Sequence, residues 1–320
     1  MIRTALDLPS LTVLLAPFDL RPRRVRGLEQ GTINSNHRVD TDGGRVFVRV
    51  NEGKSGADVR YEAALLWHLG ARRFPTPQPL RRADGRAWVE HEGKPVTAFP
   101  WVEGATVDGD AITVAHTARV GSLLAELHAA AADFRLRRDG IYTFERIARR
   151  IDGLRAEPRV ADVLPVLDEE VAFLRAARAP SLPSGTIHGD LFPDNVLWKD
   201  GRLVGALDFE QASVGRLAYD VAVAVLAWCW TGADLDPARA RALVEGYQSV
   251  RPLEAVERDG LWAEARLAAL RFTVTRITDV FLAHADRPGK DYRDYLARLA
   301  RLRELGPAAI PTTVSPTTAA

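Results

Sequence analysis

The side chains whose types and spacing most clearly suggest a chemical reaction lie in residues 187–209, IHGDLFPDNVLWKDGRLVGALDF. The segment begins as a short apolar strand, continues as a polar loop with Asp190 and Asn195, and ends as a hairpin that leads to Asp208. Phosphoryl transfer needs a carboxylate that orients or deprotonates an attacking hydroxyl, together with hard oxygen ligands for Mg²⁺. Asp and Asn are also common in ordinary turns, so the combined spacing, rather than any one residue, predicts a phosphoryl-transfer site.

The segments before Gly104 predict a small β-rich part that would position this site. Residues 23–50 alternate apolar and polar positions around turn signals, which predicts two or three antiparallel strands. In RVFVRV (45–50) the three valines share one face, and Phe47 and Arg49 share the other. A helix is predicted over 58–72, and a hairpin that turns at Glu92-Gly93 is predicted to run to Trp101.

After Gly104 the hydrophobic spacing becomes helical, except for the strand-and-loop segment 186–208. Helices are predicted at about 110–131, 143–153, 160–178, 217–230, 236–248, 253–284 and 290–304. The chain is therefore expected to be α+β, with residues 1–100 as an N-terminal nucleotide-binding lobe and residues 101–305 as a helical C-terminal lobe. That C-terminal lobe is expected to carry the catalytic loop and the acceptor site. Residues 306–320 contain few large apolar side chains and are predicted to form a disordered tail.

Composition excludes several classes of protein. Lys and Arg number 43 against 42 Asp and Glu, so bulk charge gives no reason to expect a nucleic-acid or membrane partner. A single cysteine, Cys229, excludes an internal disulfide framework and a multi-cysteine metal site. The longest apolar run, 221–230, is ten residues, against roughly 20 for a bilayer span, and predicts a buried helix. With no targeting signal visible, the protein is expected to be cytoplasmic.

The catalytic segment resembles the signature of the aminoglycoside phosphotransferase/choline kinase superfamily, which shares the bilobal protein-kinase-like fold. The matching residues are HGDLFPDNVLW and the following LDF, with the H-x-D-x-x-x-x-N spacing of a kinase catalytic loop. EQGTINSNHRV resembles the family's phosphate-covering hairpin, YEAALLWHL the lobe helix with its glutamate, and FPWVEG the hinge. Within the superfamily, LFPDNVLW, AYDVAVAVLAWCW, EGYQSVRPL and ALRFTVTRITD look most like bacterial type II homoserine kinases.

This resemblance implies roles for individual residues. Asp190 would be the catalytic base, and Asn195 and Asp208 would hold Mg²⁺. His188 is expected to brace the loop, and Asp220 to act as a buried acceptor that ties a helix to the loop. The nucleotide-binding set implied for ATP is Ser35, Arg49, Glu62, Pro100 and Val102.

The sequence departs from the kinase pattern at the position of the usual strand lysine. Lys54, Lys94, Lys199 and Lys290 are the only lysines, and the strand offers Arg49 instead. Either Arg49 supplies the phosphate-binding cation or the site works without one. Glu62 is expected to face the interior and to pair with Arg49. Glu210, which replaces the glycine of the protein-kinase Asp-Phe-Gly motif, is read equally as a group for a substrate ammonium or as a surface ion-pair residue.

Homoserine is the leading predicted acceptor, giving O-phosphohomoserine for threonine synthesis. Its ammonium and carboxylate would need acid and base together, and the helix with Arg271, Thr275, Arg276 and Asp279 offers both, although such a mixture is also typical of a solvated face. Glu210, Arg276 and Asp279 are the predicted acceptor contacts. The alternatives are another small hydroxyl acceptor (an aminoglycoside, choline or ethanolamine, or a sugar), a protein serine or threonine, or a nucleotide-binding pseudokinase scaffold.

Overall fold

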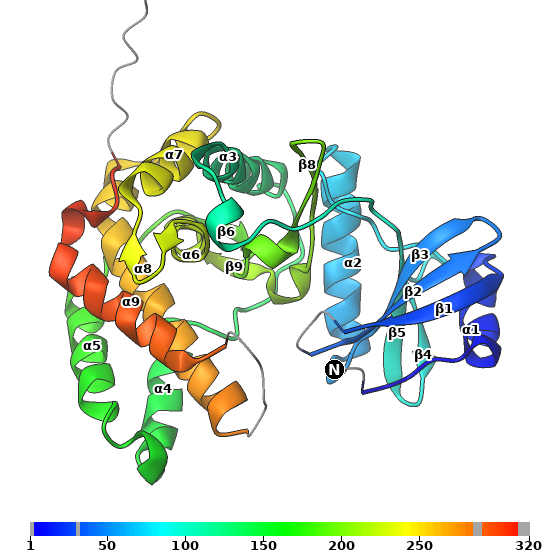
Figure 1. Ribbon diagram of the computed structural model, residues 1–320, viewed down its shortest axis with the longest axis horizontal. Helices are drawn as coiled ribbons and strands as arrows, with labels where there is room; N and C mark the ends of the chain where they lie inside the picture. Colours follow the sequence, from blue (N-terminus) through cyan, green and yellow to red (C-terminus); the bar gives the residue numbers. More distant parts are fainter. Residues whose placement is uncertain (1–2, 30–32, 284–289, 313–320) are drawn as a thin grey trace, which may run out of the picture. The chain divides into compact units, whose positions relative to one another are not determined.

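The computed structural model describes residues 3–29, 33–283 and 290–312, and it divides into two compact units (Figure 1). The first, here called the sheet unit, comprises Met1–Ala105, Phe134–Leu136 and Val196–Glu210. The second, the helical unit, comprises Thr106–Asp133, Arg137–Asn195 and Gln211–Ala320. The chain thus leaves the sheet unit near the predicted boundary at residue 100 but returns to it twice.

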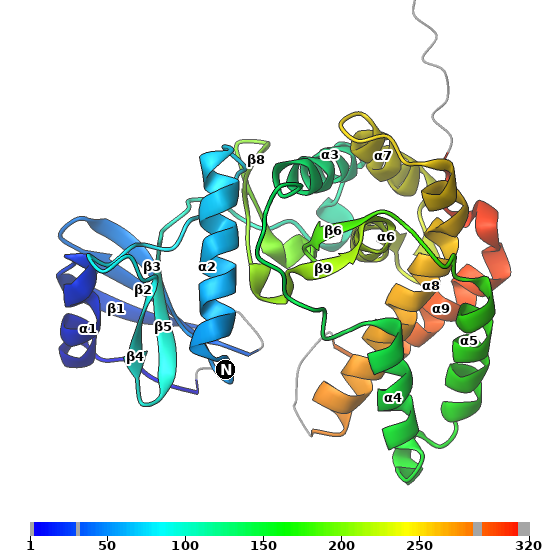
Figure 2. The ribbon, with the colours of Figure 1, turned by 180° about the vertical axis from the view of Figure 1, so that it is seen from behind.

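A five-stranded antiparallel sheet forms the centre of the described part of the sheet unit, in the order β1-β2-β3-β5-β4. Its strands are β1 (Pro22–Leu28), β2 (Ser35–Thr41), β3 (Gly44–Val50), β4 (Trp88–His91) and β5 (Lys94–Pro100). Helices α1 (Leu8–Leu15) and α2 (Gly56–Ala71) lie on opposite sides of this sheet (Figures 1 and 2). Helix α2 begins at a capping box in which Ser55 and Asp58 bond each other's backbone N–H groups.

Successive side chains of β3 alternate between two faces, and this alternation decides which of them are buried in the core and which are available to the site. Val46, Val48 and Val50 are buried in a cluster that also contains three leucines of α1, Leu11, Leu14 and Leu15. Each such valine contributes roughly 1.5–3 kcal/mol by leaving water, although the unfolded chain already buries part of this surface. The intervening residue Arg49 therefore projects from the opposite face, toward α2, as its spacing predicts.

A second hairpin joins the sheet unit after the catalytic loop. Strands β7 (Val196–Lys199) and β8 (Arg202–Ala206) pair with each other, and Ala206 N donates to Pro75 O at 2.7 Å. Trp198 and Ala105 exchange two backbone hydrogen bonds of 2.8 Å. These bonds tie the hairpin that leads to Asp208 to other segments of the sheet unit, to which it belongs.

The helical unit contains most of the remaining elements. Its helices are α3 (Val114–Ala130), α4 (Phe144–Leu154), α5 (Leu164–Ala177), α6 (Leu217–Trp228), α7 (Pro237–Gln248), α8 (Ala255–Arg276) and α9 (Tyr292–Leu305). Its strands form two pairs, β6 (Ser184–Ile187) with β9 (Ser213–Arg216) and β10 (Trp230–Thr231) with β11 (Asp234–Leu235). A short π-helix, Ile277–Phe281, extends α8, and 3₁₀ turns occupy Gly109–Ala111, Pro158–Val160, Pro193–Asn195 and Pro307–Ala309. There are two further 3₁₀ turns among the described elements. Ala16–Phe18 belongs to the sheet unit, and Phe209–Gln211 spans the point in the chain where the sheet unit ends and the helical unit resumes.

Helix α6 is mostly apolar and is buried on all sides in the core of the helical unit, as the ten-residue apolar run predicts. The indole N–H of Trp228, which is fully buried, donates to Leu191 O at 2.8 Å. Helix α8 packs against α4, α5, α6 and α9 (Figure 2). In the described part of the chain, no helix is both long enough and apolar enough to span a membrane.

The predicted disordered tail is wrong for its first residues. Residues 307–309 form a 3₁₀ turn, and Ile310, which is 2% exposed, packs in the core. One large apolar side chain is enough to hold this stretch because its burial offsets the ordering of a few residues. Residues 313–320 lie outside the described residues.

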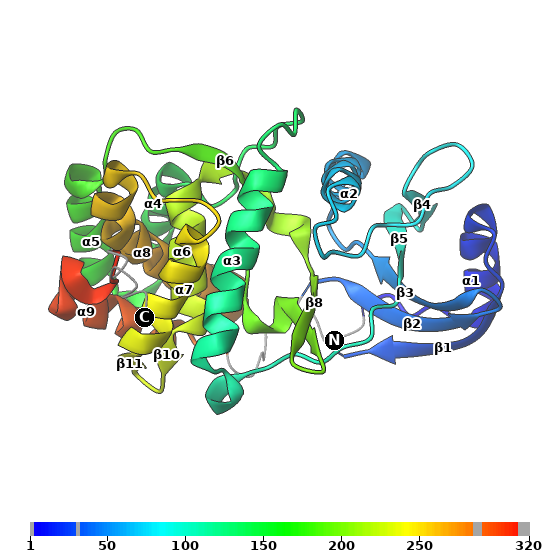
Figure 3. The ribbon, with the colours of Figure 1, turned by 90° about the horizontal axis from the view of Figure 1, so that it is seen from above.

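Helices α3 and α7 pack closely at two glycines (Figure 3). A Cβ on Gly246 would lie 2.0 Å from Ala118 O, and one on Gly121 would lie 1.9 Å from Leu243 O. These obstacles are backbone atoms, so they cannot rotate away. The two helices can approach this closely only with glycine at both positions.

We predict that Gly246→Ala lowers the free energy of unfolding by about 3 kcal/mol because α3 and α7 must separate. Gly153→Ala is the matched control, since a Cβ there meets nothing within 4 Å, and it should stabilise α4 by about 0.5–1 kcal/mol. Urea unfolding followed by tryptophan fluorescence measures both. Equal effects of the two variants would contradict the packing described.

Candidate active site

The loop after β6 is fixed by a buried carboxylate on α6. Asp220 is fully buried and accepts the backbone N–H groups of His188 and Gly189, each at 2.7 Å. Gly189 has a φ of 74°, a conformation that glycine adopts without strain. The prediction that Asp220 is a buried acceptor tying its helix to the loop is confirmed.

A histidine and a tyrosine complete this buried network. His128 Nε2 lies 3.0 Å from Asp220 Oδ2, and His128 Nδ1 lies 2.8 Å from the Tyr247 hydroxyl. Burial alone would raise the pKa of the Asp220 carboxyl, but the bonds from His128 and from the loop N–H groups hold it below its ordinary value. Asp220 therefore stays ionised. Helices α3, α6 and α7 are joined through these side chains to the catalytic loop.

The catalytic loop itself is closed by internal hydrogen bonds. Asp190 N donates to His188 Nδ1 at 3.2 Å, so His188 braces the loop as predicted. Asn195 Nδ2 donates to Asp190 O at 2.8 Å, which fixes the amide and leaves its Oδ1, the atom that a cation would use, outside that bond. Asp190 thus presents its carboxylate from a backbone held on both sides, although its side chain remains 30% exposed.

One further side chain of the helical unit reaches Asp190. Arg271 Nη1, from α8, lies 3.3 Å from Asp190 Oδ1. The sequence pointed to Arg271 only as one member of a mixed helix face, and nothing in its spacing indicated contact with Asp190.

The two acceptor residues predicted on the same segment, Arg276 and Asp279, are engaged elsewhere. Arg276 pairs with Asp294 of α9 at 3.1 Å, and Asp279 pairs with Arg150 of α4 at 3.0 Å. The structure does not bring either of them to Asp190 by a direct contact among the described residues. The reason is local: they point toward two different helices, which their spacing on one helix does not reveal.

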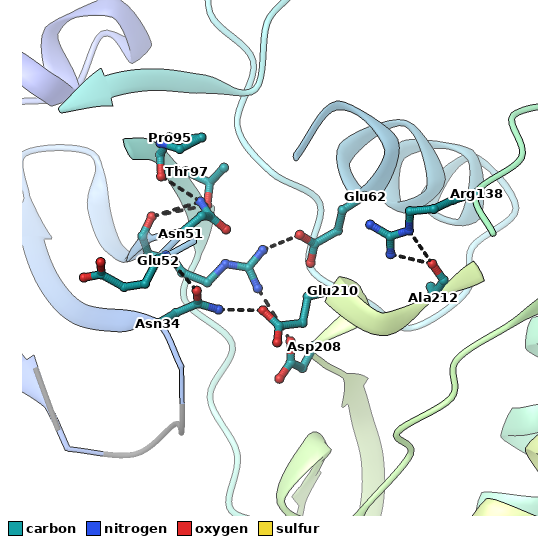
Figure 4. Close-up of polar contacts among 11 residues, drawn as sticks. Asn34, Asn51, Glu52, Glu62, Pro95, Thr97, Arg138, Asp208, Glu210 and Ala212 are labelled. Atoms are coloured by element: carbon teal, nitrogen blue, oxygen red, sulfur yellow. Dashed lines mark hydrogen bonds and ion pairs between the residues drawn. The ribbon is translucent and has the colours of Figure 1, made fainter. Parts of the chain in front are cut away.

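Arg49 is the centre of a charged cluster in the sheet unit (Figure 4). Its Nη2 lies 2.5 Å from Glu62 Oε2, its Nη1 lies 3.7 Å from Asp208 Oδ1, and its guanidinium stacks on Phe99 at 5.3 Å. Both Arg49 and Glu62 are buried, which confirms their predicted pairing. Burial would lower the pKa of Arg49, but the negative charge of Glu62, Asp208 and Glu210 raises it, so the group is permanently charged.

Glu210 belongs to the same cluster and is buried at 8% exposure, so its reading as a surface ion-pair residue is wrong. Its Oε2 accepts from Asn34 Nδ2 at 2.7 Å, and Asn34 Oδ1 accepts from Glu52 N at 3.1 Å (Figure 4). Asn34, which lies in the predicted phosphate-covering hairpin, is thus a member of this cluster. In the helical unit, the same figure shows Arg138, whose Nε donates to Ala212 O at 2.8 Å just before β9.

Asp208 has a left-handed backbone, with a φ of 62°, which is uncommon for a residue with a side chain. Such a conformation costs about 1–3 kcal/mol and is frequent at functional sites. Its carboxylate is 40% exposed beside buried Arg49. This geometry suits a carboxylate that serves a ligand rather than the core.

The side chain of Ser35, predicted to contact the nucleotide, is engaged inside the sheet unit. Ser35 is fully buried, its Oγ accepts from Arg3 N and Thr4 N at 2.9 Å, and it donates to Glu52 Oε1 at 2.8 Å. The alternation of β2 turns Ser35 inward with His37 and Val39, and turns Asn36 to the other face. Of the predicted phosphate-covering hairpin, residues 30–32 lie outside the described residues.

The predicted hinge residues lie at the end of the central sheet. Pro100 ends β5, where it pairs in register with Val46, and Val102 packs beside Gly205 of β8. Their contacts with a nucleotide remain a prediction.

Comparison with known proteins assigns the family. The model of the phosphotransferase enzyme family matches residues 24–253. The chain belongs to this family. A homoserine kinase from Phenylobacterium zucineum is 38% identical over 305 residues, which cover 91% of both chains. The chain is accordingly a small-molecule kinase, a phosphotransferase that acts on an alcohol group.

Solved structures confirm the predicted protein-kinase-like fold. A microcompartment-associated aminopropanol kinase superposes with a TM-score of 0.72 at 20% identity, covering 96% of this chain and 100% of that chain. An amicoumacin kinase in complex with AMP-PNP and Ca²⁺ superposes with a TM-score of 0.67 at 15% identity, covering 90% and 89%.

We predict that Asp220→Asn lowers the free energy of unfolding by about 3 kcal/mol at pH 7, because the new NH₂ group would face a loop N–H that needs an acceptor. The pKa of Asp220 is held below its ordinary value of 3.8, so its stabilisation is present above that pH and is lost as the pH falls through the lower folded-state pKa. The gap between wild type and variant should therefore narrow below about pH 4.

Asp279→Asn is the control for this experiment, because its carboxylate is 46% exposed and should change the free energy of unfolding by less than about 0.5 kcal/mol. Urea titrations at several pH values measure both variants. A gap for Asp220→Asn that stays constant down to acid pH would contradict the stated role of the ionised carboxylate.

Proposed function

We propose that this chain is a homoserine kinase that transfers the γ-phosphoryl group of ATP, with Mg²⁺, to the hydroxyl of L-homoserine. The observation that carries the proposal is the 38% identity to a homoserine kinase over 91% of both chains. It is supported by a catalytic loop whose backbone is fixed so that Asp190 presents its carboxylate. The product would be O-phosphohomoserine.

Asp190 serves as the base in this proposal. Its carboxylate accepts the hydroxyl proton of the acceptor as the hydroxyl oxygen bonds to the γ-phosphorus and the bond from that phosphorus to the leaving ADP oxygen breaks. Strong basicity is not required because positioning and charge neutralisation carry most of the catalysis of phosphoryl transfer. The bonds from Asp220 and His188 to the loop supply that positioning.

Asn195 and Asp208 are the proposed ligands of Mg²⁺, which would neutralise charge on the transferred phosphates. The donor set fits the ion, because Mg²⁺ prefers oxygen and keeps several waters while binding one or two carboxylates. Around Arg49 the carboxylates of Glu62, Asp208 and Glu210 outnumber the one guanidinium, and this excess negative charge favours a cation. Within the described residues no group of three or more His, Cys, Asp or Glu is placed so that it could hold a metal ion, so the proposed set depends on Asn195, Asp208 and water.

Arg49, fixed by Glu62, is the proposed cation for the nucleotide phosphates in place of the usual lysine. The guanidinium keeps its charge when buried and offers several N–H donors in one plane. Pro100 and Val102 remain the proposed contacts for the base of the nucleotide.

The test of the proposed function is ADP release with Mg-ATP and a panel of acceptors: L-homoserine, choline, ethanolamine, aminopropanol, a sugar and an aminoglycoside. We expect turnover with L-homoserine to exceed that with each of the others by at least about tenfold, and Asp190→Asn to lower kcat by at least about 1,000-fold with nucleotide affinity retained. Preferred turnover of another acceptor would overturn the choice of homoserine. Nucleotide binding without any turnover would support the scaffold alternative.

We predict that Arg49→Lys raises the KM for ATP about tenfold, because one ammonium cannot occupy the positions of two guanidinium nitrogens at Glu62 and Asp208. Arg23→Lys on β1 is the matched control, because its exposed pair with Asp42 lies outside this cluster. Steady-state kinetics with varied ATP measures both. An Arg49→Lys enzyme as good as wild type would show that charge alone is needed there.

A further inference from the structure

Arg271 is buried in the helical unit beside the proposed base. Its side chain is 5% exposed, and its guanidinium stacks on the rings of Phe272 at 3.8 Å and Tyr142 at 4.2 Å. Its one hydrogen bond among the described residues runs from Nη1 to Asp190 Oδ1, at 3.3 Å. Two aromatic rings therefore hold the plane of the guanidinium in place while most of its polar edge is not used.

Burying unpaired N–H donors of Arg271 costs free energy. Its Nε is buried and has no hydrogen-bond partner among the described residues. A guanidinium has five N–H donors, and leaving a buried donor unsatisfied costs about 1–3 kcal/mol, more for a charged group. A single long bond to the partly exposed carboxylate of Asp190 compensates little of this cost. The arrangement suits a second anion that arrives with a ligand.

A neighbouring tyrosine, Tyr219, also has a buried polar group without a hydrogen-bond partner among the described residues. The hydroxyl of Tyr219, on α6, is buried without a partner in the described part of the chain, and Tyr219 is close enough to Arg271 for their charges to interact. Burial raises the pKa of Tyr219 to about 12, so the hydroxyl remains a neutral donor at physiological pH. Arg271 and Tyr219 thus present two unsatisfied donor groups in one region.

A cavity of about 230 Å³ lies beside Tyr219 and beside Tyr142, the ring on which the Arg271 guanidinium stacks. It is lined by Tyr142 and Tyr219, and by Gly189, which immediately precedes Asp190. The buried carboxylate in its wall, Glu264, is already paired with Arg178 and Arg216 at 3.0 and 2.8 Å. The buried atom of its lining that has no partner among the described residues is the Tyr219 hydroxyl, which can donate a hydrogen bond. Together with Arg271 Nε, this donor favours an anionic ligand group.

We propose that Arg271 binds the carboxylate of the acceptor, with the Tyr219 hydroxyl as a second donor, and thereby selects hydroxy amino acids over amino alcohols. This inference rests on the proposed function, because it concerns the acceptor of that same reaction. Nε and Nη1 belong to one small planar group, so a carboxylate bound at Nε lies near Asp190. In this proposal the carboxylate of the acceptor binds at Nε and its hydroxyl lies at Asp190.

The experiment compares two acceptors that differ only by the carboxylate, L-homoserine and 3-aminopropan-1-ol. Wild type should prefer L-homoserine. Arg271→Gln should lower kcat/KM for L-homoserine about 100-fold more than kcat/KM for 3-aminopropan-1-ol, because the carboxylate contact is lost with L-homoserine alone whereas the bond to Asp190 is lost with both acceptors. Arg258→Gln, on the same helix and bonded to Leu253 O, is the control and should change neither value.

Equal losses with both acceptors would overturn the inference, because Arg271 would then act on Asp190 or on the nucleotide. Wild-type enzyme that uses both acceptors equally would also overturn it, while leaving kinase activity intact. Wild type that phosphorylates neither would overturn the proposed function itself. Should Arg271→Gln fail to fold, Arg271→Lys keeps the charge but loses Nε, and it should show the same selective loss on a smaller scale.

Discussion

The carboxylate of Asp220 is the interaction on which the catalytic loop depends. It is fully buried, yet it stays charged because two backbone N–H groups and His128 surround it. A buried charge of this kind is tolerated only when its hydrogen bonds are complete, so the loop, α3 and α6 must keep one arrangement. The glycine contact between α3 and α7 sets the position of Tyr247, which bonds the far side of His128. The packing of α3, α6 and α7 thus determines where the catalytic loop holds Asp190.

The sheet unit uses the opposite arrangement, in which one buried cation is surrounded by acids. Arg49 is fixed by Glu62 and stacked on Phe99, while Asp208 keeps an exposed carboxylate in a left-handed backbone conformation. The alternation of β3 makes this possible, since it buries three valines on one face and leaves the other for the guanidinium. The same strand therefore supplies core stability and a charged site.

Patterns local in sequence predicted most of the fold and part of the site. The interior-facing position of Glu62 on its helix predicted its pairing with Arg49, and the resemblance to the phosphotransferase superfamily implied the role of Asp220. The facing of Ser35 was not deduced, because the start of β2 is not marked in the sequence. Contacts between distant segments, such as Arg271 with Asp190 or Arg276 with Asp294, depend on how α8 and α9 pack, which helical spacing does not specify.

The central claim is that Asp190 directs a phosphoryl group from the nucleotide to a hydroxyl oxygen. The most direct measurement follows ATP labelled in its γ-phosphate, incubated with the protein, Mg²⁺ and L-homoserine. The account predicts that the label appears in an acid-stable monoester of the homoserine hydroxyl, in amounts equal to the ADP formed. Label recovered only as inorganic phosphate, or attached to the protein itself, would contradict it.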